Sequence, residues 1–440
     1  MTLIIVLILL FSYLLIATGH LTGVNKAAIA TFLGTISWVV YVIWSRDFSQ
    51  EVFLGYVGRA AAVVMFLLAT MSIIEILNNN GCFDFINEWI HTRNPNRLLW
   101  TITLATFVLS ATLDNLATTM LMLVIMHSIV KSRSQRMLIG SAIVLAACCG
   151  GCFTVIGDCT GLLLWGDESV TATQFSARLA LPALLAWIVP TIFINRELPS
   201  RLDIEWAIAP YRGDDTRLNR WQRLLMLIVG IGGLWFVPTF LSLTHLSPFL
   251  GALCVLAVLW VVNEAFNRKL MNADQMSQRR FPRVLQYGAI QQMLFVMGIM
   301  LGFGAATETG VLSAIARWME SNIGNIWFIG ILSGLLSGIV DMFTIAVSDI
   351  SIAQSLHGLT APSGPFAQNG TFWLITAYTT AVGGCLLSVG SACGIALMQM
   401  EHIRLSWYVK RIAPKILIGW LTGMAVLYLE YYLFPINNIN

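Results

Sequence analysis

The sequence predicts an all-α, polytopic membrane protein built from two inverted repeats, each with about five transmembrane helices and one re-entrant hairpin. Of its 440 residues, 57% are hydrophobic and only 11% are charged. Apolar runs long enough to span a bilayer, about 18 residues or more, recur along the whole chain. This composition leaves no room for a sizeable soluble domain and carries no signature of nucleic-acid binding.

A glycine motif that occurs twice is the strongest indication of a repeat. Gly150-Gly151-Cys152, Ile156-Gly157-Asp158 and Gly161 return with the same spacing as Gly383-Gly384-Cys385, Val389-Gly390-Ser391 and Gly394. Shorter matches precede the motif in both halves and in unbroken order, at nearly constant offsets, which indicates a duplicated chain. The hairpin tips are offset by 227 residues and the glycine motif by 233. Glycine-broken helices at matching places in two halves point to a transporter's binding site.

The first repeat is predicted over 1–194. Its segments are spans at 2–19, 26–44 and 55–79, a hairpin at 98–130, a broken helix at 138–165 and a span at 175–194. The first run lacks a positive n-region and a convincing cleavage site, so we expect a retained helix rather than a signal peptide. The hairpin arms are each roughly 24 Å long as helix, short of the roughly 30 Å apolar core of a bilayer. They join at Asp114-Asn115, which is therefore the predicted tip.

The second repeat is predicted over 222–440, after a cytoplasmic linker at 195–221. Its segments are spans at 222–241, 247–266 and 284–307, a hairpin at 326–356, a broken helix at 371–400 and a span at 416–434. The second hairpin turns at Asp341, and its near flanks contain no Lys and a single Arg, Arg317. Because positive residues mark the cytoplasmic side, this hairpin is predicted to enter the membrane from the opposite side to the first.

The charge distribution predicts the topology. Five spans in each half is an odd number, so the two halves must be inverted relative to each other. With this arrangement, the loops assigned to the cytoplasm, including 195–221 and 267–283, hold 21 of the 25 Lys and Arg residues. Both termini are then predicted to lie on the far side of the membrane.

Carboxylates inside apolar segments are the candidates for chemistry, since a buried charge is costly and is a functional hypothesis by default. Asp114 and Asp341 are at the hairpin tips, Asp158 is in the first break, Asp349 is on the return arm of the second hairpin, and Glu75 is near the end of a span. We expect no Lys or Arg near them within the membrane segments. Their charge must then be met by protons, by a cation, or by helix N-termini.

Oxygen-bearing side chains surround these carboxylates. The candidates are Asn115, Thr118, Thr160, Ser388 and Ser391. Carboxylate, hydroxyl, amide and freed backbone carbonyl oxygens are the ligands of a hard alkali cation. Each Ser or Thr could instead bond to its own helix, and Asp349 and Glu75 could be caps or line a watery vestibule. His127 is read as either a pH sensor or a solvated helix-end residue, and Cys149 and Cys152 as packing residues rather than a metal site.

These residues predict an ion antiporter without enzymatic activity or a resident cofactor. Carboxylates clustered away from water resist ionisation, through desolvation and mutual repulsion, so near neutral pH they hold either protons or a bound Na⁺ or Li⁺. A site that exchanges the two ligands and opens alternately to each side is an antiporter. We expect Na⁺ and H⁺ to compete at Asp114 and Asp158, with Asp341 assisting and Asp349 and Glu75 as further proton-coupling candidates.

Three segments resemble a known family. Residues 66–75, 113–119 and 150–160 are similar to NhaD-type sodium/proton antiporters, which belong to the ion transporter superfamily with arsenite permeases and dicarboxylate and citrate carriers. The similarity covers nearly the whole chain. It implies a bacterial inner-membrane protein active in pH homeostasis, a homodimer, and an elevator-like motion of a transport domain. The second tip departs from the expected Asp-Asn, because Met342 follows Asp341 and removes an amide ligand.

Two other functions remain open. A Na⁺-coupled carrier of an anionic substrate such as a dicarboxylate would present neutral hairpin tips, so that helix N-termini meet the anion. Aspartates at both tips would repel that substrate. A sensor or assembly subunit with a vestigial transporter fold is the third reading, and the carboxylates retained in the first half argue against it.

Overall fold

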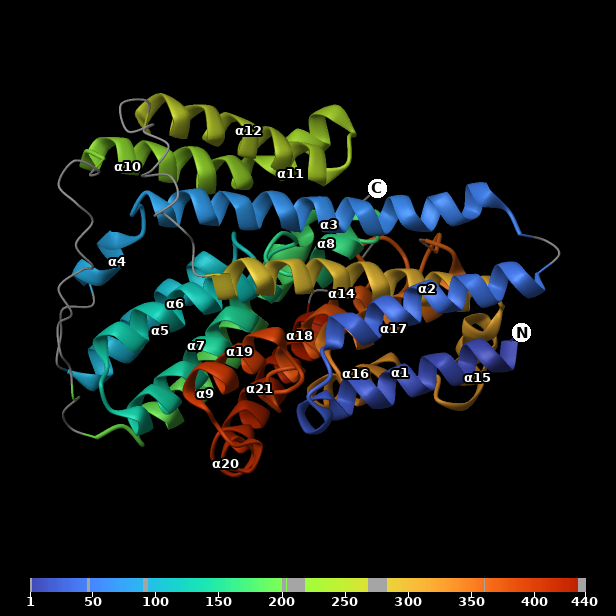
Figure 1. Ribbon diagram of the computed structural model, residues 1–440. Coiled ribbons are helices and arrows are strands. Elements are labelled where there is room, and N and C mark those ends of the chain that lie inside the picture. The colour runs from blue at the N-terminus through green and yellow to red at the C-terminus, as the bar shows by residue number, and fades with distance from the viewer. Residues whose placement is uncertain are drawn as a thin grey trace.

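The computed structural model describes residues 2–45, 48–89, 94–199, 203, 218–267, 283–359 and 361–433. Within these ranges nine helices are long and apolar enough to cross a membrane. The same ranges contain no strand, and an isolated bridge joins Ala361 and Ala367. The all-α polytopic class predicted from the sequence is confirmed (Figure 1).

Long helices from both halves of the sequence form one layer, which we call the front layer. It contains α1 (Thr2–Thr22), α2 (Lys26–Trp44), α3 (Gln50–Asn79) and α14 (Arg283–Glu308). Helices α2 and α14 lie side by side (Figure 1). They approach so closely that a Cβ on Gly298 would lie 2.3 Å from the Ala30 carbonyl. Small residues at such contacts are the usual means of packing membrane helices.

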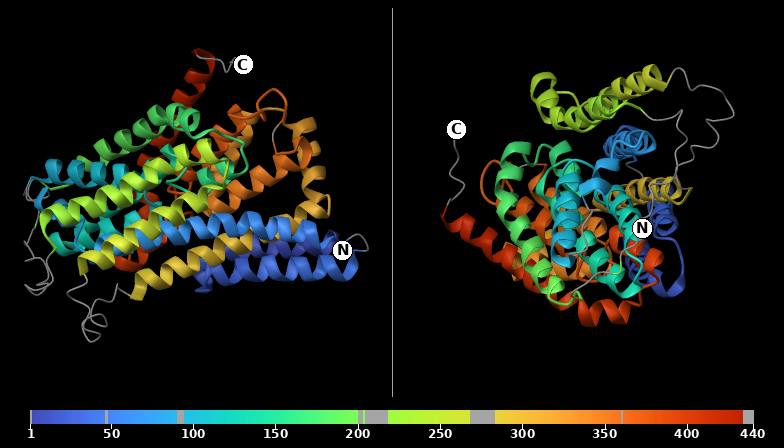
Figure 2. Two further views of the ribbon diagram at one scale, coloured as in Figure 1. Left: turned by 90° about the horizontal axis from the view of Figure 1, so that it is seen from above. Right: turned by 90° about the vertical axis from the view of Figure 1, so that its left-hand side faces the viewer.

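A helical pair covers the outer side of α3. It consists of α10 (Arg220–Leu227), a π-helical turn (Ile228–Gly232), α11 (Gly233–Thr244) and α12 (Pro248–Asn267). The predicted span at 222–241 is thus one continuous helix with a π-helical turn in its middle. At that turn Gly230 packs against Ile73 and Leu77 of α3. Figure 2 shows this pair at the edge of the molecule, away from the helices described next.

The remaining long elements form a second group, which we call the core bundle. Its elements are α5 (Pro95–Ser110), α6 (Asn115–Ile129), α7 (Arg133–Phe153), α8 (Cys159–Gly166), α9 (Ala172–Asn195), α16 (Ile326–Ile339), α17 (Met342–His357), α18 (Thr371–Gly383), α19 (Ala392–Glu401) and α21 (Ala413–Leu433). Helices α7 and α18 lie at its centre, with nearly every residue buried. Polar residues on these two helices are therefore away from lipid.

The irregular backbone of the core bundle falls inside apolar segments. The predicted broken helix at 138–165 is divided into α7 and α8, and the one at 371–400 into α18 and α19. Helices α5 and α6 form one antiparallel pair and α16 and α17 another. Three short helices were not expected, namely α4 (Asp84–Trp89), α15 (Val311–Asn322) and α20 (Leu405–Arg411). The predicted loops at 195–221 and 267–283 lie mostly outside the described residues.

Candidate functional site

Two hairpin turns and two helix breaks supply four helix N-termini inside the core bundle. Each N-terminus is capped by a side-chain oxygen at the turn or break: Asp114 caps α6, Asp158 caps α8, Asp341 caps α17 and Ser391 caps α19. An N-cap oxygen satisfies backbone N–H groups that a helix start otherwise leaves unpaired. The three predicted carboxylates therefore stabilise the helix starts that they cap, in addition to carrying charge.

Glycines bring each hairpin against its break, in the same way in both halves. A Cβ on Gly150 would lie 2.3 Å from the Phe107 carbonyl, and a Cβ on Gly383 would lie 2.3 Å from the Gly334 carbonyl. A Cβ on Gly157 would lie 2.6 Å from the Ser110 carbonyl, and one on Gly390 2.5 Å from the Ser337 carbonyl. The contacted carbonyls correspond between the halves: Gly334 follows Phe107 by 227 residues, and Ser337 follows Ser110 by 227, which is the offset of the hairpin tips. The two tips are therefore packed on equivalent backbone.

Asp114 and Asp158 form the charged centre of the first half. Asn115 Nδ2 donates to Asp158 Oδ1 at 2.8 Å, and the Thr160 backbone N–H donates to Asp158 Oδ2 at 3.1 Å. Asp114 Oδ2 accepts from the backbone N–H groups of Leu116 and Ala117. Both aspartates are buried, with exposed fractions of 2% and 5%. Neither forms a salt bridge with any described residue.

Three buried oxygens at the start of α6 have no hydrogen-bond partner among the described residues. They are Asp114 Oδ1 and, one helical turn further along, the hydroxyls of Thr118 and Thr119. Buried polar atoms are nearly always paired, so each exception needs an explanation such as a bound ion or proton. The site therefore combines two carboxylates that lack a cationic partner with buried oxygens that can still coordinate a cation or accept a hydrogen bond.

Asp341 is different, because a lysine reaches it. Lys26 Nζ, at the start of α2, lies 3.5 Å from Asp341 Oδ2. The expectation that no Lys or Arg lies near the membrane carboxylates is thus wrong for Asp341. From the sequence, Lys26 is expected in the cytoplasmic loop before the span, whereas its long side chain extends to a hairpin that begins some 300 residues later.

The other predicted residues are distributed around these tips. The Ser391 hydroxyl accepts from the Gly394 backbone N–H at 3.0 Å, and the Ser388 hydroxyl contacts the Met398 sulfur at 2.8 Å. Asp349 is buried two turns along α17, next to Ser333 of α16, and is not part of either tip. Glu75 lies on α3, in the front layer.

A cavity of about 1250 Å³ separates the front layer from the core bundle at one end of the molecule. Among its lining residues are Lys26, Glu75, Gln292, Asp341 and Val389. Asp114 and Asp158 do not line it, and the nearest lining residues are Leu116 and Ala117 at the start of α6. The cavity thus opens at the end predicted to be cytoplasmic and stops just short of the Asp114–Asp158 centre.

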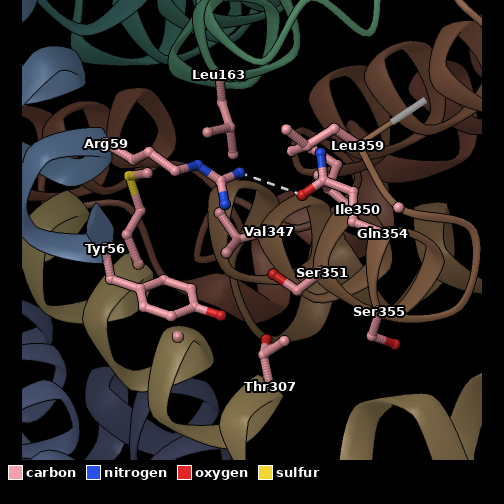
Figure 3. A pocket seen from close by; sticks show the side chains of 13 residues that line it. Tyr56, Arg59, Leu163, Thr307, Val347, Ile350, Ser351, Gln354, Ser355 and Leu359 are labelled. Atoms are coloured by element: carbon pink, nitrogen blue, oxygen red, sulfur yellow. Dashed lines mark hydrogen bonds between the residues drawn. The ribbon is translucent and has the colours of Figure 1, made fainter. Parts of the chain in front are cut away.

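At the opposite end, the front layer and the core bundle are joined by polar contacts. Arg59 of α3 donates to Asp167 at the end of α8 (Nε to Oδ1, 3.0 Å) and to Gln354 of α17 at 3.2 Å. Gln354 Nε2 in turn donates to Asp167 Oδ2 at 3.1 Å. Figure 3 shows Arg59 and Gln354 meeting beside a smaller cavity of about 230 Å³. Sixteen residues separate Arg59 from Glu75 on α3, about 24 Å along the helix.

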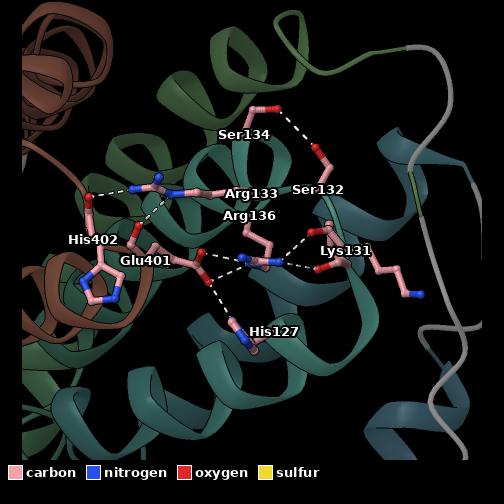
Figure 4. Close-up of polar contacts among 9 residues, drawn as sticks. His127, Lys131, Ser132, Arg133, Ser134, Arg136, Glu401 and His402 are labelled. Carbon is pink, nitrogen blue, oxygen red and sulfur yellow. Dashed lines mark hydrogen bonds and ion pairs between the residues drawn. The ribbon is translucent and has the colours of Figure 1, made fainter.

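A second charged cluster was missed by sequence reasoning. Glu401, only 2% exposed, accepts from Arg136 Nε at 2.9 Å through both carboxylate oxygens and lies 2.9 Å from His127 Nδ1. Arg133 donates to the backbone carbonyls of Glu401 and His402 (Figure 4). His127 is therefore a partner of a buried carboxylate, and not simply a solvated helix-end residue. Glu401 escaped notice because it lies one residue beyond the predicted broken helix.

Comparison with known proteins identifies the family. A family model described as citrate transporter matches residues 2–383, most of the chain. The chain belongs to the citrate transporter family. The resemblance noted in the sequence is confirmed, and this family member is a membrane transporter rather than an enzyme.

Several relatives carry names of ion exchangers. Sodium/proton antiporter 1 of Arabidopsis thaliana is 30% identical over 413 residues, which cover 91% of this chain and 68% of the relative. Sodium/proton antiporter 2 of the same plant is 28% identical, over 96% of this chain and 98% of the relative. The Na⁺/H⁺ antiporter NhaD of Vibrio cholerae is 25% identical, over 89% of this chain and 83% of the relative.

Proposed function

We propose that this transporter exchanges Na⁺ or Li⁺ for H⁺ across the membrane by alternating access. The observation that carries the proposal is the buried pair of Asp114 and Asp158, which has no cationic partner among the described residues. Relatives named sodium/proton antiporters support it.

The exchange follows from the cost of leaving these carboxylates charged. Two carboxylates in an apolar bundle repel each other and lack water, so each must be neutralised. A proton or an alkali cation can serve, and the two compete for the same oxygens. Asp114 Oδ1 and the Thr118 hydroxyl provide ion ligands, while Asn115 and the Thr160 N–H orient Asp158. Binding of Na⁺ therefore displaces protons, and protonation releases Na⁺.

The remaining predicted residues take secondary roles in the proposal. Asp341 assists from the second tip, and Glu75 is a lining residue of the large cavity that stays a candidate for proton coupling. Ser388 and Ser391 shape the second break through their own contacts. Asp349 stays a candidate for proton coupling only, since it lies away from both tips.

The competing function is transport of an anion such as citrate, after the family description. An anion would use the N–H groups of the helix N-termini. At both hairpin tips those groups are already bonded: Asp114 accepts from Leu116 and Ala117, and Asp341 accepts from Phe343 and Thr344. The chain's own carboxylates thus occupy the positions that an anionic substrate needs, and this favours a cation.

We further propose the setting in which the exchange occurs. The positive loops favour two inverted repeats with re-entrant hairpins and with both termini on the side opposite the cytoplasm. The family resemblance favours a bacterial inner membrane, which would place both termini in the periplasm. The large cavity at the predicted cytoplasmic end and the Arg59 contacts at the other end support an inward-facing state. Movement of the core bundle against the front layer would then open the other side, and the family resemblance favours a homodimer.

The proposal is tested in vesicles that contain the purified protein and an imposed pH gradient. Adding Na⁺ is expected to dissipate the gradient in the wild type and in Glu51→Gln, an exposed control on α3. Asp114→Asn and Asp158→Asn are each expected to abolish the response. Wild-type activity in both aspartate variants would overturn the proposal. Uptake of citrate without any proton response to Na⁺ would favour the anion carrier instead.

A further inference from the structure

We propose that the Lys26 ammonium is the resident cation of a second cation site, in the second half, which leaves the first-half site alone for the transported ion. This inference deepens the proposed function and rests on it for the identity of the transported ion. It arises from the contacts of one side chain and from the equivalence of the two tips.

Lys26 Nζ is surrounded by oxygens from two segments of the core bundle. It donates to the Val389 carbonyl at 2.7 Å and to the Val340 carbonyl at 3.2 Å, while Asp341 Oδ2 lies at 3.5 Å. An ammonium has three donors and finds three acceptors here. The carboxylate contact is the longest of the three, so this is not a simple ion pair. The group lies in a cage of two freed backbone carbonyls and one carboxylate, the ligand set of an alkali cation.

The first half contains the equivalent oxygens. The hairpin offset of 227 places Leu113 and Asp114 opposite Val340 and Asp341, and the glycine offset of 233 places Ile156 opposite Val389. The matched glycine contacts described above support this alignment in space. In the first half, Asp114 Oδ1 is buried and has no partner among the described residues. The two cages thus have matching backbone positions and a tip aspartate in common, and a lysine fills only the second.

The lysine and its cage belong to different parts of the molecule. Lys26 is on α2 of the front layer, whereas Val340, Asp341 and Val389 are in the core bundle. The Lys26 side chain is 16% exposed and is among the residues that line the large cavity. It is therefore bound by the cage oxygens and is still accessible from the cavity. Any movement of the bundle along the layer must therefore withdraw the ammonium from the cage. In this way the second tip is neutral when the cavity is open, and no second Na⁺ is needed.

The test is the number of ²²Na⁺ ions bound per chain in purified full-length protein, at alkaline pH so that carboxylates are ionised. We expect one ion in the wild type and two in Lys26→Met. Lys26→Arg, which keeps the charge, and Lys410→Met, an exposed control on α20, should each bind one. Lys26→Met with Asp341→Asn should return to one.

A further pair of variants separates this inference from the proposed function. Asp114→Asn should bind no Na⁺, whereas Asp114→Asn with Lys26→Met should bind one, in the second-half cage. A wild type that binds none would refute the proposed function, yet a gain of one ion in Lys26→Met would still support the cage.

Two results would overturn the inference. One is a folded Lys26→Met protein, monodisperse and as stable as Lys410→Met, that binds no more Na⁺ than the wild type. The other needs no lysine variant and so does not depend on how Lys26→Met folds: Asp341→Asn should still bind one ion, and a loss of all binding would place the transported ion at the second tip.

Discussion

The two hairpin tips share their backbone and differ in how charge is balanced. In both, glycines of the break lie against carbonyls of the first hairpin arm at nearly the same distances, and an aspartate caps the return helix. At the first tip a second carboxylate, Asp158, lies nearby and no described cation pairs with either. At the second tip, Lys26 is present and a serine replaces the second carboxylate. Duplication supplies the geometry, while a few side chains decide which copy has ion-exchange chemistry.

The comparison also explains why Met342 replaces the expected asparagine. In the first half, Asn115 is needed because its amide donates to Asp158. In the second half, Ser391 occupies the place of Asp158 and already bonds to the Gly394 N–H. An amide at 342 would have no carboxylate to orient there, so an apolar side chain is sufficient. Met342 keeps a backbone role, since its N–H donates to the Gly390 carbonyl at 2.8 Å.

The largest expected effect tests the shared backbone. Gly157→Ala and Gly390→Ala each place a Cβ within 2.6 Å or less of a hairpin carbonyl. Because backbone cannot move aside as a flexible side chain does, each should cost about 3 kcal/mol, the upper end of overpacking penalties. Thermal unfolding in detergent should show similar losses for both variants. Full stability of one variant beside collapse of the other would show that the tips are not equivalent.

Substitutions of the two residues that follow the tip aspartates, Asn115 and Met342, should affect Na⁺ affinity to different extents in the two halves. Asn115→Met leaves Asp158 Oδ1 without its donor, which costs about 1–3 kcal/mol, or roughly 5- to 150-fold in apparent Na⁺ affinity. Met342→Asn should change that affinity less than about twofold, because it lies outside the transported-ion site. The measurement is the Na⁺ concentration for half-maximal dissipation of a pH gradient. Equal losses in both variants would contradict the functional asymmetry.

A substitution of Arg59 tests whether the contacts of Arg59 with Asp167 and Gln354 stabilise the inward-facing state, in which the large cavity is open. Arg59→Gln removes charged hydrogen bonds to Asp167 and weakens the link to Gln354, and should shift the conformational equilibrium by about 1–2 kcal/mol. A cysteine placed at Thr307, beside the smaller cavity, should then react faster with an impermeant maleimide, in a background with Cys254→Ser. Arg317→Gln, an exposed arginine of α15, is the matched control. An unchanged rate in Arg59→Gln would mean that these contacts do not hold the closed end.

The smallest expected effect concerns His127, which links the first-half hairpin to the second-half broken helix. His127→Gln should cost only about 0.5–1.5 kcal/mol, because Arg136 still contacts both oxygens of Glu401. The midpoint of thermal unfolding should fall slightly, and Na⁺ affinity should stay as in the wild type. A large loss of Na⁺ affinity would contradict this expectation, because it would show that the contact between His127 and Glu401 contributes to ion binding.

Much of the fold and part of the site follow from the sequence. Apolar runs define the membrane helices because their length must match the bilayer, and paired glycines mark the places where α7 and α18 end. Asp114 and Asp158 stand out because charge is rare in such segments. Lys26 could not be assigned to Asp341 in this way, since the contact joins residues 315 apart and depends on helix packing. Glu401 was missed because it lies one residue beyond the predicted broken helix, and its contacts with Arg136 and His127 on other helices depend on packing in the same way.

The central claim is that one tip binds the transported ion while the other holds Lys26. An experimental structure of the wild-type protein in high Na⁺ tests it most directly. We predict one ion, coordinated by Asp114 Oδ1, with the Lys26 ammonium still within hydrogen-bonding distance of the Val389 carbonyl. An ion beside Asp341 with Lys26 displaced, and none at Asp114, would contradict the account.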